Sequence, residues 1–228
     1  MKAAIDLYCE RDGVGFWAEP FNAFSNAAFL LAMAWALVEI RRRRPGDWRL
    51  IGLSLLAGVI GIGSFLFHTF ANGWSSVADV VPIWTFVALY VVEAVRRMNG
   101  VSPRHVAGVA VGGIAVGIAI AWIFASGFAT DGGDAAGPLN GSQQYAPALL
   151  ALLGFAALTL AARHPQAPWI AGAAAVFLVS LVLRTIDPHV CDALPVGTHF
   201  LWHLLNGTMI ALLLQALIRM PERKPAAA

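Results

Sequence analysis

Apolar residues run along the chain in seven long stretches separated by short polar breaks. The stretches cover residues 23–40, 50–70, 80–96, 105–125, 146–162, 169–183 and 198–218. Each is too long for a β-strand and lacks the alternation of apolar and polar residues that a half-buried strand shows. Backbone in contact with lipid must satisfy its own hydrogen bonds, which favours helices. The pattern therefore predicts an all-α membrane protein, a bundle of seven transmembrane helices.

The composition supports a membrane protein. Of the 228 residues, 59% are hydrophobic and 12% are charged, with a mean hydropathy of +0.71; soluble domains carry about 25% charged residues. A crossing needs about 20 apolar residues, so the length allows about seven or eight crossings and leaves almost nothing for a soluble domain. This excludes ordinary cytosolic and nucleic-acid-binding proteins. We expect one domain over 1–228, with an N-terminal arm (1–22), the bundle (23–219) and a tail (220–228).

The basic residues predict the orientation of the bundle. Twelve of the 15 lysines and arginines lie in alternate connections and after the last stretch, on one side of an up-and-down bundle. Only Lys2, Arg11 and Arg184 lie near the other side. The positive-inside rule then places the N-terminus and the arm outside and the C-terminus in the cytoplasm. Short loops and helices rich in alanine and glycine favour a bacterial protein, so we expect a multi-pass protein of the inner membrane.

The two cysteines fall on the expected outer face. Cys9 lies in the arm and Cys191 lies between the last two stretches. Disulfides persist on the non-cytoplasmic side of a membrane. The sequence favours a bridge between them, and the alternative is a pair of free thiols.

Candidate chemistry gathers at one depth of the predicted bundle. Ser64 and His68 share a helical face at the end of stretch 50–70, Asp79 opens the next stretch, and His199 and His203 form a second pair four residues apart. The up-and-down topology places all five toward the outer leaflet. Two histidines one turn apart and a third from elsewhere suit zinc, with a fourth position for water. Asp79 suits a proton acceptor and Ser64 a donor to an oxyanion. The alternative is three hydrogen-bonded core histidines.

A second polar cluster lies in the arm. Four carboxylates occur within fourteen residues: Asp6, Glu10, Asp12 and Glu19. Oxygen ligands of this kind suit a hard cation such as calcium. A solvated acidic loop, with Glu19 near the N-terminus of the first helix, explains the pattern equally well.

Five motif blocks occur in order along the chain: Tyr8-Cys9-Glu10, Glu19-Pro20-Phe21-Asn22-Ala23-Phe24-Ser25-Asn26, Gly63-Ser64-Phe65-Leu66-Phe67-His68, Asp79 and His199-Phe200-Leu201-Trp202-His203. Together they resemble the alkaline ceramidases, part of a superfamily of seven-helix zinc hydrolases that includes the adiponectin receptors. The arm departs from the family pattern, with Tyr8 in place of a tryptophan and Asp12 in place of an asparagine.

The resemblance implies a set of roles. Zinc would lie on His68, His199 and His203. Ser64 would contact the oxyanion and the substrate, and Asp79 would activate water. The arm would bind calcium, and Cys9 would pair with Cys191.

The expected function is therefore that of an intramembrane zinc hydrolase of lipid metabolism. It would cleave the N-acyl amide bond of ceramide-like lipids into a sphingoid base and a fatty acid, with a membrane lipid as its partner and with no nucleic acid or protein partner. The main alternative is a lipid sensor on the same scaffold. A serine protease using Ser64 and a haem carrier using His68 and His203 fit less well. A retinal protein is excluded, because the last stretch contains no lysine.

Overall fold

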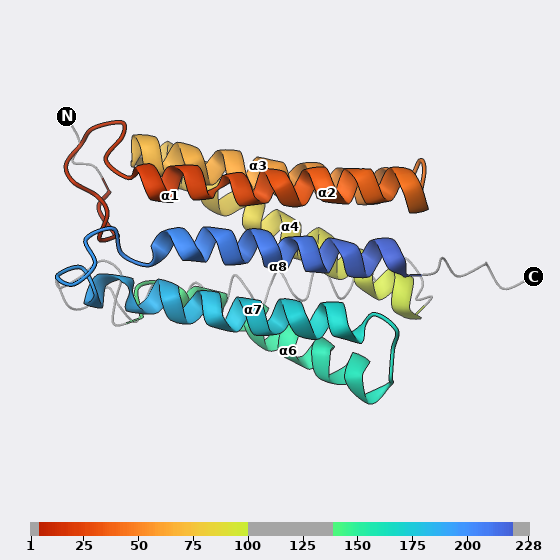
Figure 1. Ribbon diagram of the computed structural model, residues 1–228. Helices are drawn as coiled ribbons and strands as arrows, with labels where there is room; N and C mark the ends of the chain where they lie inside the picture. Colours follow the sequence, from red (N-terminus) through yellow and green to blue (C-terminus); the bar gives the residue numbers. More distant parts are fainter. Residues whose placement is uncertain (1–4, 100–138, 221–228) are drawn as a thin grey trace, which may run out of the picture.

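The computed structural model describes residues 5–99 and 139–220, and every regular element within those ranges is a helix (Figure 1). The helices are α1 (Pro20–Ser25), α2 (Ala27–Arg43), α3 (Trp48–Phe70), α4 (Gly73–Asn99), η1 (Ser142–Tyr145), α6 (Ala146–Ala161), α7 (Ala167–Ile186), η2 (Asp187–His189) and α8 (His199–Arg219). The all-α prediction is thus confirmed for the part of the chain that the structure describes.

Six of the seven predicted crossings are present as helices long and apolar enough to span a membrane. The six spans are Pro20–Arg43, Trp48–Phe70, Gly73–Arg97, Ser142–Ala161, Ala167–His189 and His199–Arg219. The predicted fourth crossing, 105–125, lies outside the described residues. The orientation of the bundle in the membrane stays a prediction.

One boundary differs clearly from the sequence prediction. The helix expected over 80–96 begins at Gly73, so Asp79 lies in its second turn rather than at its start. The reason is a reciprocal cap: the Asn72 side-chain oxygen accepts from the Ser75 backbone N–H (3.2 Å), and Ser75 Oγ accepts from the Asn72 N–H (3.1 Å). Such a cap stabilises the first turn of a helix, here one that mixes polar with apolar residues. An apolar pattern alone does not reveal it.

The innermost helix of the described bundle is α8. It runs between α2 and α3 on one side and α6 and α7 on the other (Figure 1), and packs most extensively against α7 and α2. Leu214, Leu217 and Ile218 are fully buried on it and form the core with Ile40 and Leu50. By contrast, α4 and α6 bury few of their residues. Their exposed apolar faces suit contact with lipid.

Ion pairs gather at one end of the bundle, where α2, α4 and α8 end and α3 begins. Glu39 pairs with Arg43 (2.6 Å) and with Arg219 (3.3 Å). Arg97 bridges Asp47 (2.6 Å) and Glu93 (2.7 Å). This end is the basic side that the sequence predicts, and the candidate site occupies the other end.

Candidate functional site

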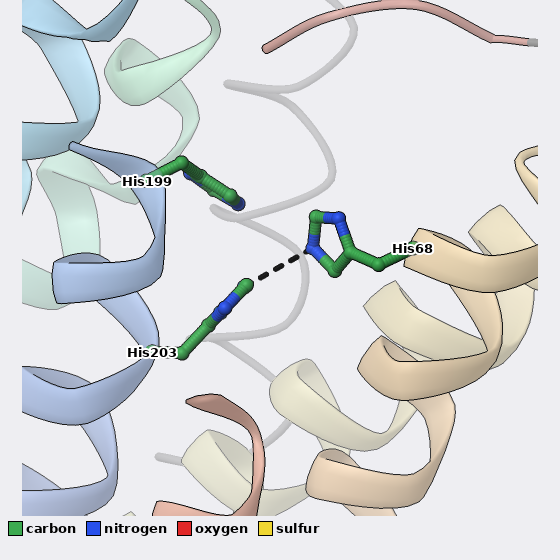
Figure 2. Close-up of side chains that lie close together, drawn as sticks. All are labelled: His68, His199 and His203. Carbon is green, nitrogen blue, oxygen red and sulfur yellow. Dashed lines mark hydrogen bonds between the residues drawn. The ribbon is translucent and has the colours of Figure 1, made fainter. Parts of the chain in front are cut away.

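The three candidate histidines meet at the end of the bundle that carries the arm. His68 comes from the last turn of α3, and His199 and His203 come from the first two turns of α8 (Figure 2). Each ring offers a nitrogen, and these nitrogens all lie within 4.8 Å of one another. The residues are 1%, 1% and 2% exposed. The group is placed to bind a metal ion, as the sequence predicts, and three imidazoles suit zinc.

Hydrogen bonds on the far side of two rings decide which nitrogen is free. Ser25 Oγ donates to the Asn22 carbonyl (2.9 Å) and lies 2.8 Å from His203 Nδ1, so it accepts the Nδ1 proton. His68 Nδ1 donates in the same way to the Glu19 carboxylate. Both Nε2 atoms are therefore left with lone pairs, and they face each other at 3.2 Å. Two lone pairs at that distance repel unless a cation lies between them, so these residues fit a metal.

The third ring, His199, is held by aromatic stacking. Its plane lies against that of Tyr8 with 3.5 Å between ring centroids and an angle of 13°. The Tyr8 hydroxyl accepts a hydrogen bond from Arg184 (2.9 Å). The arm therefore covers the histidines and forms one wall of the site.

Asp187 fixes the start of α8. Its Oδ1 accepts from the backbone N–H groups of Thr198 (2.6 Å) and His199 (2.9 Å), and its Oδ2 accepts from that of Cys9 (3.1 Å). A carboxylate at a helix N-terminus is favourable because the first N–H groups there lack partners. The chain approaches so closely that a Cβ at Gly197 would overlap Asp187 Oδ1. Sequence reasoning missed Asp187, which offered only the weak signal of a carboxylate near Cys191.

The arm is also tied down covalently. Cys9 and Cys191 form a disulfide, with their Cα atoms 5.0 Å apart. The predicted bridge is present, and it joins the arm to the segment just before α8.

Ser64 and Asp79 line the same cavity as His199 and His203, a space of about 230 Å³. Ser64 Oγ lies 3.5 Å from His203 Nε2. Gly63, the residue before Ser64, allows α3 and α4 to approach closely, because a Cβ at this position would overlap the Ala78 carbonyl oxygen of α4. This contact places Ser64 of α3 beside Asp79 of α4. The structure thus brings both residues to the histidines, as the sequence predicts.

The four arm carboxylates do not gather into one group of ligands in the structure. Asp6 and Asp12 are exposed. Glu10 instead accepts backbone hydrogen bonds from Phe21 (2.5 Å) and Asn22 (2.7 Å) at the start of α1. Within the described residues, only the three histidines form a metal-binding group of this kind.

Arg11 supplies the positive charge that Glu19 needs. Its Nε pairs with Glu19 Oε1, and its terminal nitrogens donate to the carbonyls of His68 (3.0 Å) and Gly13 (3.3 Å). Both side chains of the pair are almost completely buried. Burial raises the pKa of the Glu19 carboxyl, and the Arg11 guanidinium opposes that rise. The structure gives the calcium expectation no support, and the count of carboxylates behind that expectation left out the arginine among them.

Comparison with known proteins gives one positive result. None of the curated proteins matches the chain. The model of the ceramidase family matches residues 2–132, which include the arm, Ser64, His68 and Asp79. Since this match covers more than half of the 228 residues, the chain belongs to the ceramidase family.

Proposed function

We propose that this protein is a zinc-dependent intramembrane hydrolase that cleaves the N-acyl amide bond of a ceramide-like lipid, giving a sphingoid base and a fatty acid. The observation that carries the proposal is the pair of facing Nε2 atoms of His68 and His203, buried beside His199. Membership of the ceramidase family implies a hydrolase and suggests a lipid substrate.

The side chains around the cavity supply the remaining functions that amide hydrolysis needs. His68, His199 and His203 would hold the zinc, which when bound supplies Lewis-acid polarisation of the amide carbonyl and a lowered pKa of water. Asp79 accepts a proton from the attacking water as the oxygen joins the carbonyl carbon. It then returns the proton to the amide nitrogen as the carbon–nitrogen bond breaks. The Ser64 hydroxyl donates to the carbonyl oxygen as negative charge develops there.

Exposed aromatic residues support a site at the level of the lipid headgroups. They gather around the arm and the neighbouring ends of α1, α3 and α4, and comprise Phe16, Trp17, Phe21, Phe24, Phe70 and Trp74. Trp17 contacts Phe16, Phe24 and Phe65. Aromatic belts mark the membrane–water interface. A lipid amide lies at this depth, so it reaches the histidines while its chains stay in the bilayer.

Replacing Asp79 tests the proton transfer. Asp79→Asn keeps the shape of the side chain but removes its basicity, so we expect the rate of ceramide hydrolysis to fall by about 10²–10⁴-fold with zinc content unchanged. Release of a fluorescent fatty acid in detergent micelles measures the rate. Asp12→Asn, an exposed carboxylate of the arm, is the matched control and should retain the wild-type rate. An unchanged rate in Asp79→Asn would remove Asp79 from the reaction.

Replacing Ser25 tests whether its hydroxyl orients the His203 ring. Ser25→Ala removes the acceptor of the Nδ1 proton, and loss of such an outer partner lowers metal affinity by about 10–100-fold. Titration against a competing chelator measures the zinc affinity. Ser54→Ala is the control, because the Ser54 hydroxyl is buried in α3 and bonds only the Leu50 carbonyl. Equal zinc affinity in the two variants would contradict the assigned hydrogen bond.

Thermal unfolding tests whether the arm requires calcium or is neutralised by Arg11. Because its guanidinium already neutralises Glu19, we expect added calcium to leave the melting temperature of the wild type unchanged. Arg11→Met leaves the Glu19 carboxylate buried without its cation, which should cost about 3–5 kcal/mol of stability. Thermal unfolding in detergent measures both effects. A melting temperature of the wild type that rises with calcium would show that the arm binds the ion after all.

A further inference from the structure

One buried charge at the site has no part in the hydrolysis proposed above. Arg184 lies in the last turn of α7, is 7% exposed, and lines the same cavity as Asp79, His199 and His203. A buried guanidinium is costly unless an anion compensates it. The group that neutralises the charge of Arg184 therefore bears on the function of the site.

Three other arginines that are buried or half-buried have carboxylate partners. Arg11 pairs with Glu19, Arg97 with Asp47 and Glu93, and Arg219 with Glu39. Arg184 forms no such pair with any described carboxylate. Within the described part of the chain, its one side-chain hydrogen bond goes to the Tyr8 hydroxyl, and its Nε is buried without a partner.

Aromatic rings hold the Arg184 guanidinium in place. Its central carbon lies 5.2 Å from the Trp202 ring, 5.5 Å from Tyr8 and 5.7 Å from Tyr145. Such contacts stabilise a cation without neutralising it. Among the residues that the structure describes, Asp79 is the only carboxylate that lines the cavity, and amide hydrolysis engages it in proton transfer. The positive charge of Arg184 thus remains available to a bound anion.

We propose that Arg184 forms a carboxylate-binding subsite beside the histidines, for the carboxylate of an acyl lipid. The planar guanidinium matches a carboxylate, which accepts hydrogen bonds from two of its N–H groups. This inference rests on the proposed function, since the lipid amide is placed at the histidines. The carboxylate has two sources: the polar part of an N-acyl amino acid used as substrate, or the fatty acid released by hydrolysis.

Binding without turnover tests the subsite. The probes are N-palmitoylglycine, palmitate and the methyl ester of each, and native mass spectrometry of the chelator-treated protein in detergent measures their dissociation constants. We expect the wild type to bind a carboxylate about tenfold more tightly than its ester, the value of one charge-assisted hydrogen bond. Arg184→Gln should abolish this preference and leave ester binding unchanged.

The control is Arg219→Gln, which removes an arginine that also lies over a tryptophan ring (4.9 Å from Trp169), at the opposite end of the bundle. It should keep the full preference. Should Arg184→Gln fail to fold, Arg184→Lys serves in its place: it keeps the charge but loses the planar fork, so the preference should fall by about threefold or more.

Comparing N-palmitoylglycine with palmitate separates the two sources of the carboxylate. A preference that depends on Arg184 for N-palmitoylglycine alone identifies a substrate subsite, and one for palmitate alone identifies a product subsite. No preference in the wild type, or a preference that survives in the Arg184 variants, overturns the subsite. Ceramide hydrolysis is measured separately. If the protein does not hydrolyse ceramide but keeps its preference for carboxylates, only the proposed function is overturned.

Discussion

The proposed chemistry of this protein depends on two buried imidazole lone pairs that face each other inside the bundle. His68 Nε2 and His203 Nε2 lie 3.2 Å apart, and each ring donates its other nitrogen to a fixed acceptor. Neither ring can turn without breaking that outer bond, so a cation is the partner that removes the repulsion. The most buried helix, α8, carries two of the three rings, and this burial limits their movement.

The arm is part of the site rather than a cover added to it. It supplies Glu19 to His68 and Tyr8 to His199, while Ser25 of the following helix supplies the acceptor for His203. The disulfide and the Asp187 carboxylate anchor the arm to the start of α8. Segments almost 200 residues apart are therefore held together at the point where the chemistry is proposed. Membership of the ceramidase family gives this arrangement a functional context.

Much of the site could be predicted from local sequence patterns. The spacing of His199 and His203 places both on one face of a helix, and alternating helix directions bring them to the end of the bundle that holds His68. The disulfide follows from the same topology. Apolar patterning also located six described helices, but it missed the first turns of α4, because Gly73 to Asp79 mix polar with apolar residues and a side-chain cap stabilises the start of the helix.

Tertiary ion pairing could not be predicted in this way. Counting charges in the arm did not reveal that the Arg11 side chain is buried against Glu19. The sequence likewise did not reveal that Asp187 caps α8. Arg184 looked like an outer-face cation in the sequence, whereas in the structure aromatic rings enclose it. These contacts join residues distant in sequence, and periodicity carries no information about them.

The measurement that tests the central claim most directly is the zinc content of the purified protein by elemental mass spectrometry. The wild type should contain about one zinc per chain, as three histidine ligands imply. His203→Ala should lose it, while His189→Ala, which changes an exposed histidine near the same end, should retain it. A folded wild type without zinc, or full zinc content in His203→Ala, would contradict the metal centre described here.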